Sequence, residues 1–290
     1  MPVKDFGLII SLPKTKILSQ GSTYKPSIKL DNYELGVVED FPYLGSNISE
    51  SLSLDTEINK KIGKAAGTLS KLTGRVWENP LLKVSTKMSV YSACILSTLL
   101  YGSETWTPYA RQEEKLQIFH LRSLRFILGI KWEQKKTNVE VLEIAGLKSM
   151  FTLLRQRRLR WLGHVHRMND GRIPKDLLYG ELKEGVRDQG RPLLRYRDVC
   201  KRDMKAIDID PSSWERLASD RDAWKRTLKR QLPIGEAKWK AKAAEKREKR
   251  KEKAKASELP HPPSSFICGN CGRDCKARIG LLSHSKKCPG

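Results

Sequence analysis

The chain has 290 residues and a formal net charge of +23, because 56 lysines and arginines outnumber 33 aspartates and glutamates. This length is typical of two domains, or of one domain with appended segments, and 39% hydrophobic residues are enough for a buried core. The positive excess indicates a polyanionic partner, namely DNA, RNA or an anionic membrane surface. It argues against an acidic scaffold and against a secreted disulfide-rich module.

No segment of the sequence is suited to spanning a membrane. The longest apolar stretch, residues 90–101, is too short and contains Ser92, Ser97 and Thr98. The N-terminus has no charged region followed by a long apolar run, so the sequence predicts no signal peptide. We therefore expect a nuclear or cytoplasmic protein that is neither secreted nor bound to a membrane.

The first 50 residues have the features of short β-strands. Short apolar runs over residues 8–10 and 14–18 are typical of strands. Residues 27–30 and 33–38 flank the turn-forming pair Asp31-Asn32, which predicts a hairpin. Residues 41–45 (FPYLG) are expected to form a turn that leads into one more short strand.

From residue 54 onward the pattern becomes helical. Apolar residues recur at three- and four-residue spacing over residues 54–72. Most of the lysines of this segment are expected on its solvent face: Lys60, Lys61, Lys64 and Lys71. Further helices are predicted over residues 85–102 and 110–128, with Gly102 and Gly129 as C-terminal caps.

The rest of the chain alternates predicted helices with loops. Residues 137–170 are expected to be helical, and residues 171–192 form a connector rich in glycine and proline. Two shorter helices follow over residues 194–207 and 214–232. Residues 236–256 predict a solvated charged helix, and residues 257–265, with three prolines, a linker. We divide the chain into a β-rich region (1–50), a helical region (51–132), a basic helical extension (133–232), a charged helix with linker (233–264) and a terminal domain (265–290).

Four residues of the terminal domain have the spacing of zinc ligands. Cys268 and Cys271 are separated by two residues, and His284 and Cys288 follow twelve residues later with three residues between them. This spacing is typical of a ββα zinc finger, in which a knuckle and a helix bring four ligands around one Zn²⁺. Phe266 and Leu281 stand at the apolar core positions of such a finger. A disordered tail with chance cysteines is the alternative.

Cys275 lies between the two ligand pairs. We expect it to be a small core residue where such fingers usually carry an aromatic side chain, with a role as ligand as the alternative. The base-facing positions of the finger would be Ala277, Gly280 and Ser283, and two of these lack a hydrogen-bonding side chain. The finger is therefore expected to bind nucleic acid with weak sequence specificity.

Four basic residues of the finger could contact phosphates: Lys276, Arg278, Lys286 and Lys287. The rival interpretation is a protein contact through Ile279 and Leu282. The lysine-rich run over residues 246–255 fits a nuclear localisation signal or a nucleic-acid arm, and equally a solvated linker.

A second basic cluster surrounds one tryptophan in the predicted helix over residues 137–170. Arginine suits phosphate recognition and an indole can stack on a base, so this cluster predicts a contact with RNA, DNA or a hybrid of the two. A solvated helix face with the tryptophan in the core is the alternative. The cluster consists of Arg155, Arg157, Arg158, Arg160, Trp161 and Arg167. Nearby, His164 and His166 have a spacing that places them on different helix faces.

Several strings of the sequence resemble non-LTR (LINE-type) retrotransposon reverse transcriptases. Gly7-Leu8, Lys14-Thr15-Lys16 and residues 41–45 resemble the strand and turn that follow the catalytic strand of that family's palm. Residues 100–106 (LYGSETW) resemble a stretch of its thumb, and residues 158–168 (RLRWLGHVHRM) a segment beyond the thumb. Residues 279–284 (IGLLSH) resemble a string in the terminal zinc fingers of certain elements.

The resemblance implies a chain without the family's catalytic carboxylates. Polymerisation in the family uses Mg²⁺ ions held by acidic residues, including a Tyr-x-Asp-Asp turn upstream of the matched strings. No Asp-Asp pair occurs in this sequence, and the isolated Asp5 and Asp31 belong to no such turn. We therefore expect no polymerase activity from this chain alone.

Together, the residues and the resemblance predict a mainly helical fold with an N-terminal β-hairpin region and a C-terminal zinc finger. The expected function is zinc and nucleic-acid binding by a remnant of a reverse transcriptase. Within the family, such a tail is implied to hold template and target during target-primed reverse transcription. A transposon-derived host zinc-finger adaptor or regulator, binding DNA or protein, is the alternative.

Overall fold

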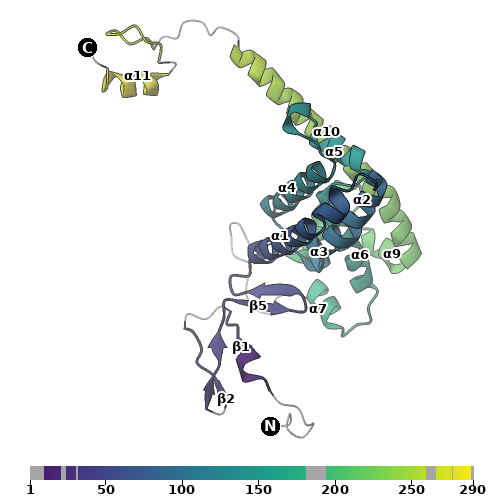
Figure 1. Ribbon diagram of the computed structural model, residues 1–290. Helices are drawn as coiled ribbons and strands as arrows, with labels where there is room; N and C mark the ends of the chain where they lie inside the picture. The colour runs from purple at the N-terminus through teal and green to yellow at the C-terminus, as the bar shows by residue number, and fades with distance from the viewer. Residues whose placement is uncertain are drawn as a thin grey trace. The chain divides into compact units, whose positions relative to one another are not determined.

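The computed structural model describes residues 10–20, 24–30, 32–180, 194–258, 266–275 and 277–288, and it divides the chain into two compact units, residues 1–237 and 238–290 (Figure 1). The predicted fold class is confirmed: the described residues are mainly helical, with short strands near the N-terminus. The predicted Gly7-Leu8 element, Asp5, Asp31, most of the linker and Lys276 lie outside the described residues. No helix among the described residues is long and apolar enough to cross a membrane.

Among the residues that the structure describes, the strands form three two-stranded ribbons. Strand β1 (Lys16–Ile17) pairs in parallel with β4 (Gly36–Val37). The predicted hairpin is present as β2 (Lys29–Leu30) and β3 (Tyr33–Glu34), in antiparallel register. Strand β5 (Asp40–Tyr43) pairs antiparallel with β6 (Ser46–Ser49), the additional strand that the sequence predicts.

Three boundaries in this region differ from the prediction. The strand expected over residues 33–38 is divided at Leu35 into β3, which forms the hairpin, and β4, which pairs with β1. The turn expected over residues 41–45 is confined to Leu44 and Gly45, whose φ angles are +46° and +84°, and Phe41–Tyr43 belong to β5 instead. The strand expected over residues 14–18 is shortened at its start, because a 3₁₀ turn with proline in its first positions covers Leu12–Lys14.

Helix α1 (Leu54–Lys71) forms where the apolar spacing predicts it, but Lys61 does not face the solvent. The Lys61 side chain is 4% exposed, its ammonium donates to the Gly45 carbonyl oxygen at 3.0 Å, and it lies 4.6 Å from the centre of the Tyr101 ring. Glu57 provides a carboxylate 3.6 Å from this ammonium. The lysine is buried because it fastens the β5–β6 turn to α1, and burial lowers its pKa.

The first group of helices surrounds α1. The predicted second helix is present as α2 (Val84–Val90), a π-helical turn (Tyr91–Leu96) and α3 (Ser97–Leu99), and Gly102 follows with a φ of +78°. Helix α4 (Ala110–Ile127) matches its predicted bounds within one residue. Helix α5 (Asn138–Ala145) begins at a Thr137 capping box and ends at Gly146. The helices α3, α4 and the π-helical turn contact α1, and α5 contacts α4.

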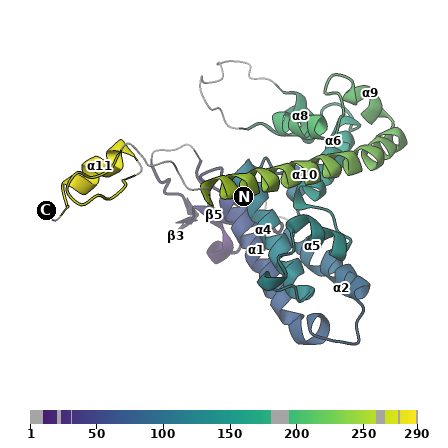
Figure 2. The same cartoon turned by 90° about the horizontal axis from the view of Figure 1, so that it is seen from above.

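Helix α6 (Met150–His166) joins this group to a second one, because it contacts α4 on one side and α8 and α9 on the other. Helix α8 (Tyr196–Ala206) agrees with the prediction for residues 194–207. Side chains of α6, α8, α9 and α10 enclose a second core that includes Leu159, Met204, Trp214 and Trp224. Figure 2 shows α10 in the same region as α6, α8 and α9.

Two predictions about this group are wrong. Residues 173–179 form helix α7 (Ile173–Tyr179) inside the expected connector, because Pro174 lies in the first turn, where proline favours a helix start. The helix expected over residues 214–232 is two helices, α9 (Trp214–Ser219) and α10 (Arg221–Glu258), separated by Asp220. The Asp220 side chain accepts a hydrogen bond from the Asp222 backbone at 2.8 Å and so starts a new helix.

Helix α10 also continues through Pro233, although an internal proline costs a helix about 3 kcal/mol or more. Packing on both sides of the proline outweighs this cost, because Leu232 is 2% exposed and Gly235 lies against Ile207. The remainder of α10, from Lys238, belongs to the second unit and is exposed along most of its length, as predicted for residues 236–256. The second unit also contains helix α11 (Arg278–Ser285).

Candidate metal centre and nucleic-acid interface

A tight hairpin positions the first pair of predicted zinc ligands. Ile267 and Asp274 form an antiparallel bridge, and the chain turns back between them at Gly272, whose φ is +71°. The Gly272 amide donates to the Cys268 carbonyl at 2.9 Å. Because glycine adopts a positive φ without steric cost, it closes the turn that brings Cys268 and Cys271 to the same side of the hairpin.

Helix α11 supplies the second pair. His284 lies in its last turn, and Cys288 follows the helix after two further residues of turn. The helix approaches the hairpin closely, because a Cβ on Gly280 would lie 2.4 Å from the carbonyl oxygen of Cys275. A larger residue than glycine at this position would therefore push the helix away from the knuckle and separate the two ligand pairs.

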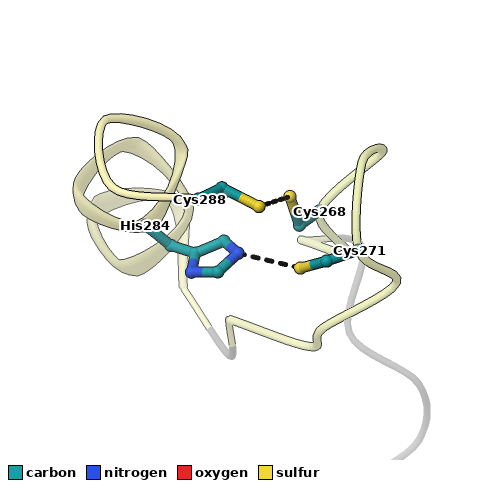
Figure 3. A group of neighbouring side chains, drawn as sticks. All are labelled: Cys268, Cys271, His284 and Cys288. Atoms are coloured by element: carbon teal, nitrogen blue, oxygen red, sulfur yellow. Dashed lines mark hydrogen bonds between the residues drawn. The ribbon is translucent and has the colours of Figure 1, made fainter. Parts of the chain in front are cut away.

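All four side chains converge between the knuckle and the helix (Figure 3). Their potential ligand atoms lie within 4.8 Å of one another, with 3.8 Å between Cys268 Sγ and Cys288 Sγ, and 3.0 Å between Cys271 Sγ and His284 Nε2. A tetrahedral Zn²⁺ with Zn–S bonds of about 2.3 Å requires sulfur atoms about 3.8 Å apart. The Cys₃His donor set and its spacing therefore fit Zn²⁺, with the histidine Nε2 as the nitrogen ligand.

The thiols of the cluster are not equivalent. Backbone N–H groups of Cys271 and Asn270 donate to Cys268 and lower the pKa of its thiol to about 6. Hydrogen bonding to Cys271, together with burial and the nearby Cys268, raises the pKa of Cys288 to about 12. Because metal ligands are thiolates, a bound cation would stabilise the deprotonated form of these cysteines.

Cys275 does not belong to the converging group of ligand atoms among the described residues. Its side chain is half-buried beside Gly280 and within 3.7 Å of the Arg273 carbonyl, in agreement with the interpretation of a core residue. Phe266 and Leu281, the predicted core positions of the finger, are also half-buried. The structure exposes the other predicted contact residues of the finger: Arg278, Ile279, Leu282, Lys286 and Lys287.

The arginine cluster of α6 is divided by the structure. Arg158 has no exposed side-chain surface, so it is wrongly assigned as a nucleic-acid contact. Its Nε donates to Asp203 in α8 at 2.6 Å, and its Nη2 donates to Glu113 in α4 at 2.9 Å. Because a buried guanidinium needs carboxylate partners, Arg158 joins three helices in the core instead of facing a ligand.

Arg155 and Arg157 are also engaged by carboxylates. The Nε of Arg155 lies 3.5 Å from Asp203, and its side chain is 19% exposed. Arg157 lies 3.8 Å from Glu104 in an ion pair whose two side chains are both more than one-third exposed. Such an exposed pair contributes about 1 kcal/mol or less, so Glu104 holds Arg157 only weakly.

The remaining members of the cluster are exposed or half-buried. Arg160 is exposed, and Trp161 is half-buried with its ring centre 5.3 Å from that of His164. Arg167 donates through Nη1 to the Ala218 carbonyl at 2.6 Å, which fixes its guanidinium at the end of α9. As the spacing predicts, the two histidines diverge: the His166 side chain turns away to hydrogen-bond with neighbouring side chains.

Three adjoining hollows follow this face of the first unit, and together we call them the basic groove. The first hollow has a volume of about 530 Å³, the second about 780 Å³ and the third about 420 Å³. The first and second share Arg160 and His164, and the second and third share Arg167. Among the described residues, only two carboxylates line the groove, those of Glu104 and Asp222. Six cationic side chains line it: Arg157, Arg160, Arg167, Arg172, Arg221 and Lys225.

Half of these cations are missing from the sequence-based assignment. Arg172 precedes α7, and Arg221 and Lys225 occupy the first turns of α10. The i, i+4 spacing of Arg221 and Lys225 places both on one helix face, which is a usable signal. The sequence contains 56 basic residues, however, and only the packing of α10 against α6 shows which of them reach this groove.

Comparisons with known proteins add one similarity. No family model matches the chain, and no solved structure matches it. The chain is similar to a transposon-derived protein of Caenorhabditis elegans, with 25% identity over 239 residues that cover 78% of this chain and 84% of that protein. The match is far longer than the zinc-finger segment, so it includes a large part of the helical unit.

Proposed function

We propose that this chain derives from a retrotransposon and corresponds to the region that follows the catalytic strand of a non-LTR reverse transcriptase, where it binds nucleic acid in the basic groove. Similarity to a transposon-derived protein over most of both chains supports the origin. The observation that carries the binding function is the groove itself, which is lined by six cationic side chains, by only two carboxylates and by Trp161. Phosphates attract such a lining, and an indole offers a surface for bases.

The placement of the family-like strings supports the same origin. The turn at Leu44 and Gly45 lies against the LYGSETW string, since a Cβ on Gly45 would be 3.1 Å from the Tyr101 ring and a Cβ on Gly102 would be 2.9 Å from Ser46 Oγ. All but the last two residues of the RLRWLGHVHRM string lie in α6, which contacts the 3₁₀ turn Ser103–Thr105. The three strings at residues 41–45, 100–106 and 158–168 therefore pack in the first unit, as expected if they were inherited together.

The second part of the proposal is that the chain binds one Zn²⁺ through Cys268, Cys271, His284 and Cys288. The convergence of these four side chains, with potential ligand atoms within 4.8 Å of one another, supports this assignment. We further propose that the chain has no polymerase activity by itself, because its sequence contains no Asp-Asp pair. Metal-dependent primer extension by the purified chain would contradict this part.

A salt titration of the full chain tests the binding function. Fluorescence anisotropy of labelled RNA and DNA oligonucleotides is measured between about 50 and 200 mM salt, where neutralised phosphates make log K fall linearly with log salt. Arg160→Gln and Lys225→Gln should each reduce the magnitude of the slope by about 1. Arg75, an exposed arginine outside the groove, provides the control variant Arg75→Gln, which should leave the slope unchanged. A flat slope for the wild-type chain would refute the proposal.

A host zinc-finger adaptor is a second candidate function, and the exposed apolar surface of α11 favours it. Ile279 is 83% exposed and Leu282 is 56% exposed. In the adaptor interpretation these residues contact a protein, and the finger contributes nothing to nucleic-acid binding. Replacing both Lys286 and Lys287 by glutamine separates the two functions: a smaller salt slope supports a nucleic-acid role for the finger, and an unchanged slope supports the adaptor.

A further inference from the structure

The basic groove contains more than a charged surface, because its two larger hollows differ in chemistry and meet at one arginine. Arg160 and His164 line both hollows, so these two side chains stand on the ridge between them. Neither hollow is large enough for a nucleic-acid duplex, but volumes of about 530 and 780 Å³ are those of sites for small organic ligands, the size class of a nucleotide.

The first hollow offers a surface for a base. Trp161 lines it beside His164, together with Leu153 and the amide of Gln156. The two rings are tilted by 50° and their centres are 5.3 Å apart, so they form an aromatic corner. An aromatic wall with a neighbouring amide suits stacking and edge hydrogen bonding of an unpaired base.

The second hollow offers an apolar floor beneath several cations. Trp224 and Leu228 contribute the floor, and the indole N–H of Trp224 is already donated to the Leu159 carbonyl at 2.9 Å. Only the carbon surface of this indole is therefore offered to the hollow. Arg221 and Lys225 line the same hollow from the first turns of α10, together with the carboxylate of Asp222.

We infer that the groove selects single-stranded nucleic acid, with neighbouring nucleotides in the two hollows and the phosphate that links them on Arg160. This inference rests on the proposed nucleic-acid-binding function and specifies its ligand. In a duplex the bases are paired and stacked, so a duplex offers phosphates to the cations and leaves Trp161 without a partner. A single strand uses the arginine ridge and the aromatic corner together.

The test compares single strands and duplexes of the same sequence on the full chain. Labelled RNA and DNA single strands of about 12 nucleotides and the corresponding duplexes are titrated by fluorescence anisotropy. Trp161→Leu should weaken single-strand binding about tenfold, as expected for the loss of one stacked base, and change duplex binding less than about twofold. Trp161→Phe, which retains an aromatic face, should restore most of the single-strand affinity. The RNA and DNA arms show whether the sugar contributes.

Trp132 provides the matched control. It is 83% exposed, more than Trp161, and it follows Lys131 in the sequence, but it lines none of the hollows of the basic groove. Trp132→Leu should leave both affinities unchanged if stacking requires the aromatic corner. A urea unfolding curve of each variant verifies that the first unit remains folded.

The possible outcomes separate this inference from the proposed function. If Arg160→Gln lowers the salt slope but Trp161→Leu affects single strands and duplexes equally, the groove binds nucleic acid without selecting single strands, and the inference is overturned. If the wild-type chain prefers the duplex, the inference is overturned as well. If neither Arg160→Gln nor Lys225→Gln changes binding to either form, the proposed function fails together with the inference.

Discussion

Arg158 links three helices from a position without any exposed side-chain surface, and replacing it tests how the helical unit is held together. Its two carboxylate partners, Asp203 and Glu113, are 2% and 10% exposed. Arg158→Met removes the charge while keeping a long unbranched side chain, so most of the effect comes from leaving two buried carboxylates without their central partner. Breaking a buried ion pair in this way typically costs 3–5 kcal/mol, as an order of magnitude.

Two neighbouring arginines reduce the expected loss of stability. Asp203 retains Arg155 at 3.5 Å, and Glu113 retains Arg202 at 3.2 Å. Arg155 and Arg202 are both partly exposed, so each can compensate only in part. We therefore expect Arg158→Met to lower the free energy of unfolding by about 3 kcal/mol, the lower end of that range.

Urea unfolding of the full chain, followed by the fluorescence of its buried tryptophans, measures this loss. If the free energy of unfolding falls by about 2 kcal/mol for each molar of urea, the urea midpoint should fall by about 1.5 M. Arg157→Met is the matched control, because Arg157 lies next in the sequence but in a partly exposed pair, and it should change stability by less than about 1 kcal/mol. Adding Asp203→Asn to Arg158→Met should recover part of the loss. Equal midpoints for Arg157→Met and Arg158→Met would refute the reasoning.

Three further predictions concern packing, pH and metal. Gly163→Ala should destabilise the chain by about 1–3 kcal/mol, because the new Cβ would lie 2.4 Å from the indole nitrogen of buried Trp224. Gly67→Ala in α1 should stabilise the chain by about 1 kcal/mol, because its Cβ would meet nothing within 4 Å. Urea midpoints of the two variants that shift in the same direction would contradict this. Burial lowers the pKa of His120 to about 4, so the unfolded state binds more protons than the folded state between pH 6.5 and 4. The urea midpoint of unfolding should therefore fall as the pH decreases through that window. His120→Gln should make the midpoint less dependent on pH, and an unchanged pH dependence would show that other groups cause it. Cys288→Ser should abolish zinc binding, and Cys275→Ser should retain it, as measured by metal analysis of the purified chain. If both variants lost zinc equally, Cys275 would be a ligand.

Local sequence patterns predict several elements accurately. The apolar spacing locates α1, and the bounds of α4 are correct within one residue. The four converging residues of the finger are found by spacing alone, since a knuckle and a helical turn fix the separation of ligands along the chain.

Errors occur where the outcome depends on distant residues. Arg158 resembles Arg157 and Arg160 in sequence, but Asp203 and Glu113, each 45 residues away, draw it into the core. One local signal was available, because Leu154 and Leu162 lie four residues on either side of Arg158 and share its helix face. Lys61 is a similar case, in which the turn at Gly45 provides a partner that helix periodicity cannot reveal.

The net charge of +23, the helical pattern and the ligand spacing of the finger are properties of the sequence by itself, because each depends on composition or on residues close together in the chain. The basic groove is a property of the tertiary structure. It combines residues of α6 with residues of α10 about 60 positions later, and only the packing of these helices determines which cations face the groove and which neutralise buried carboxylates. A helix has several faces, and the sequence specifies its period, whereas the neighbouring helices decide which face remains open to a ligand.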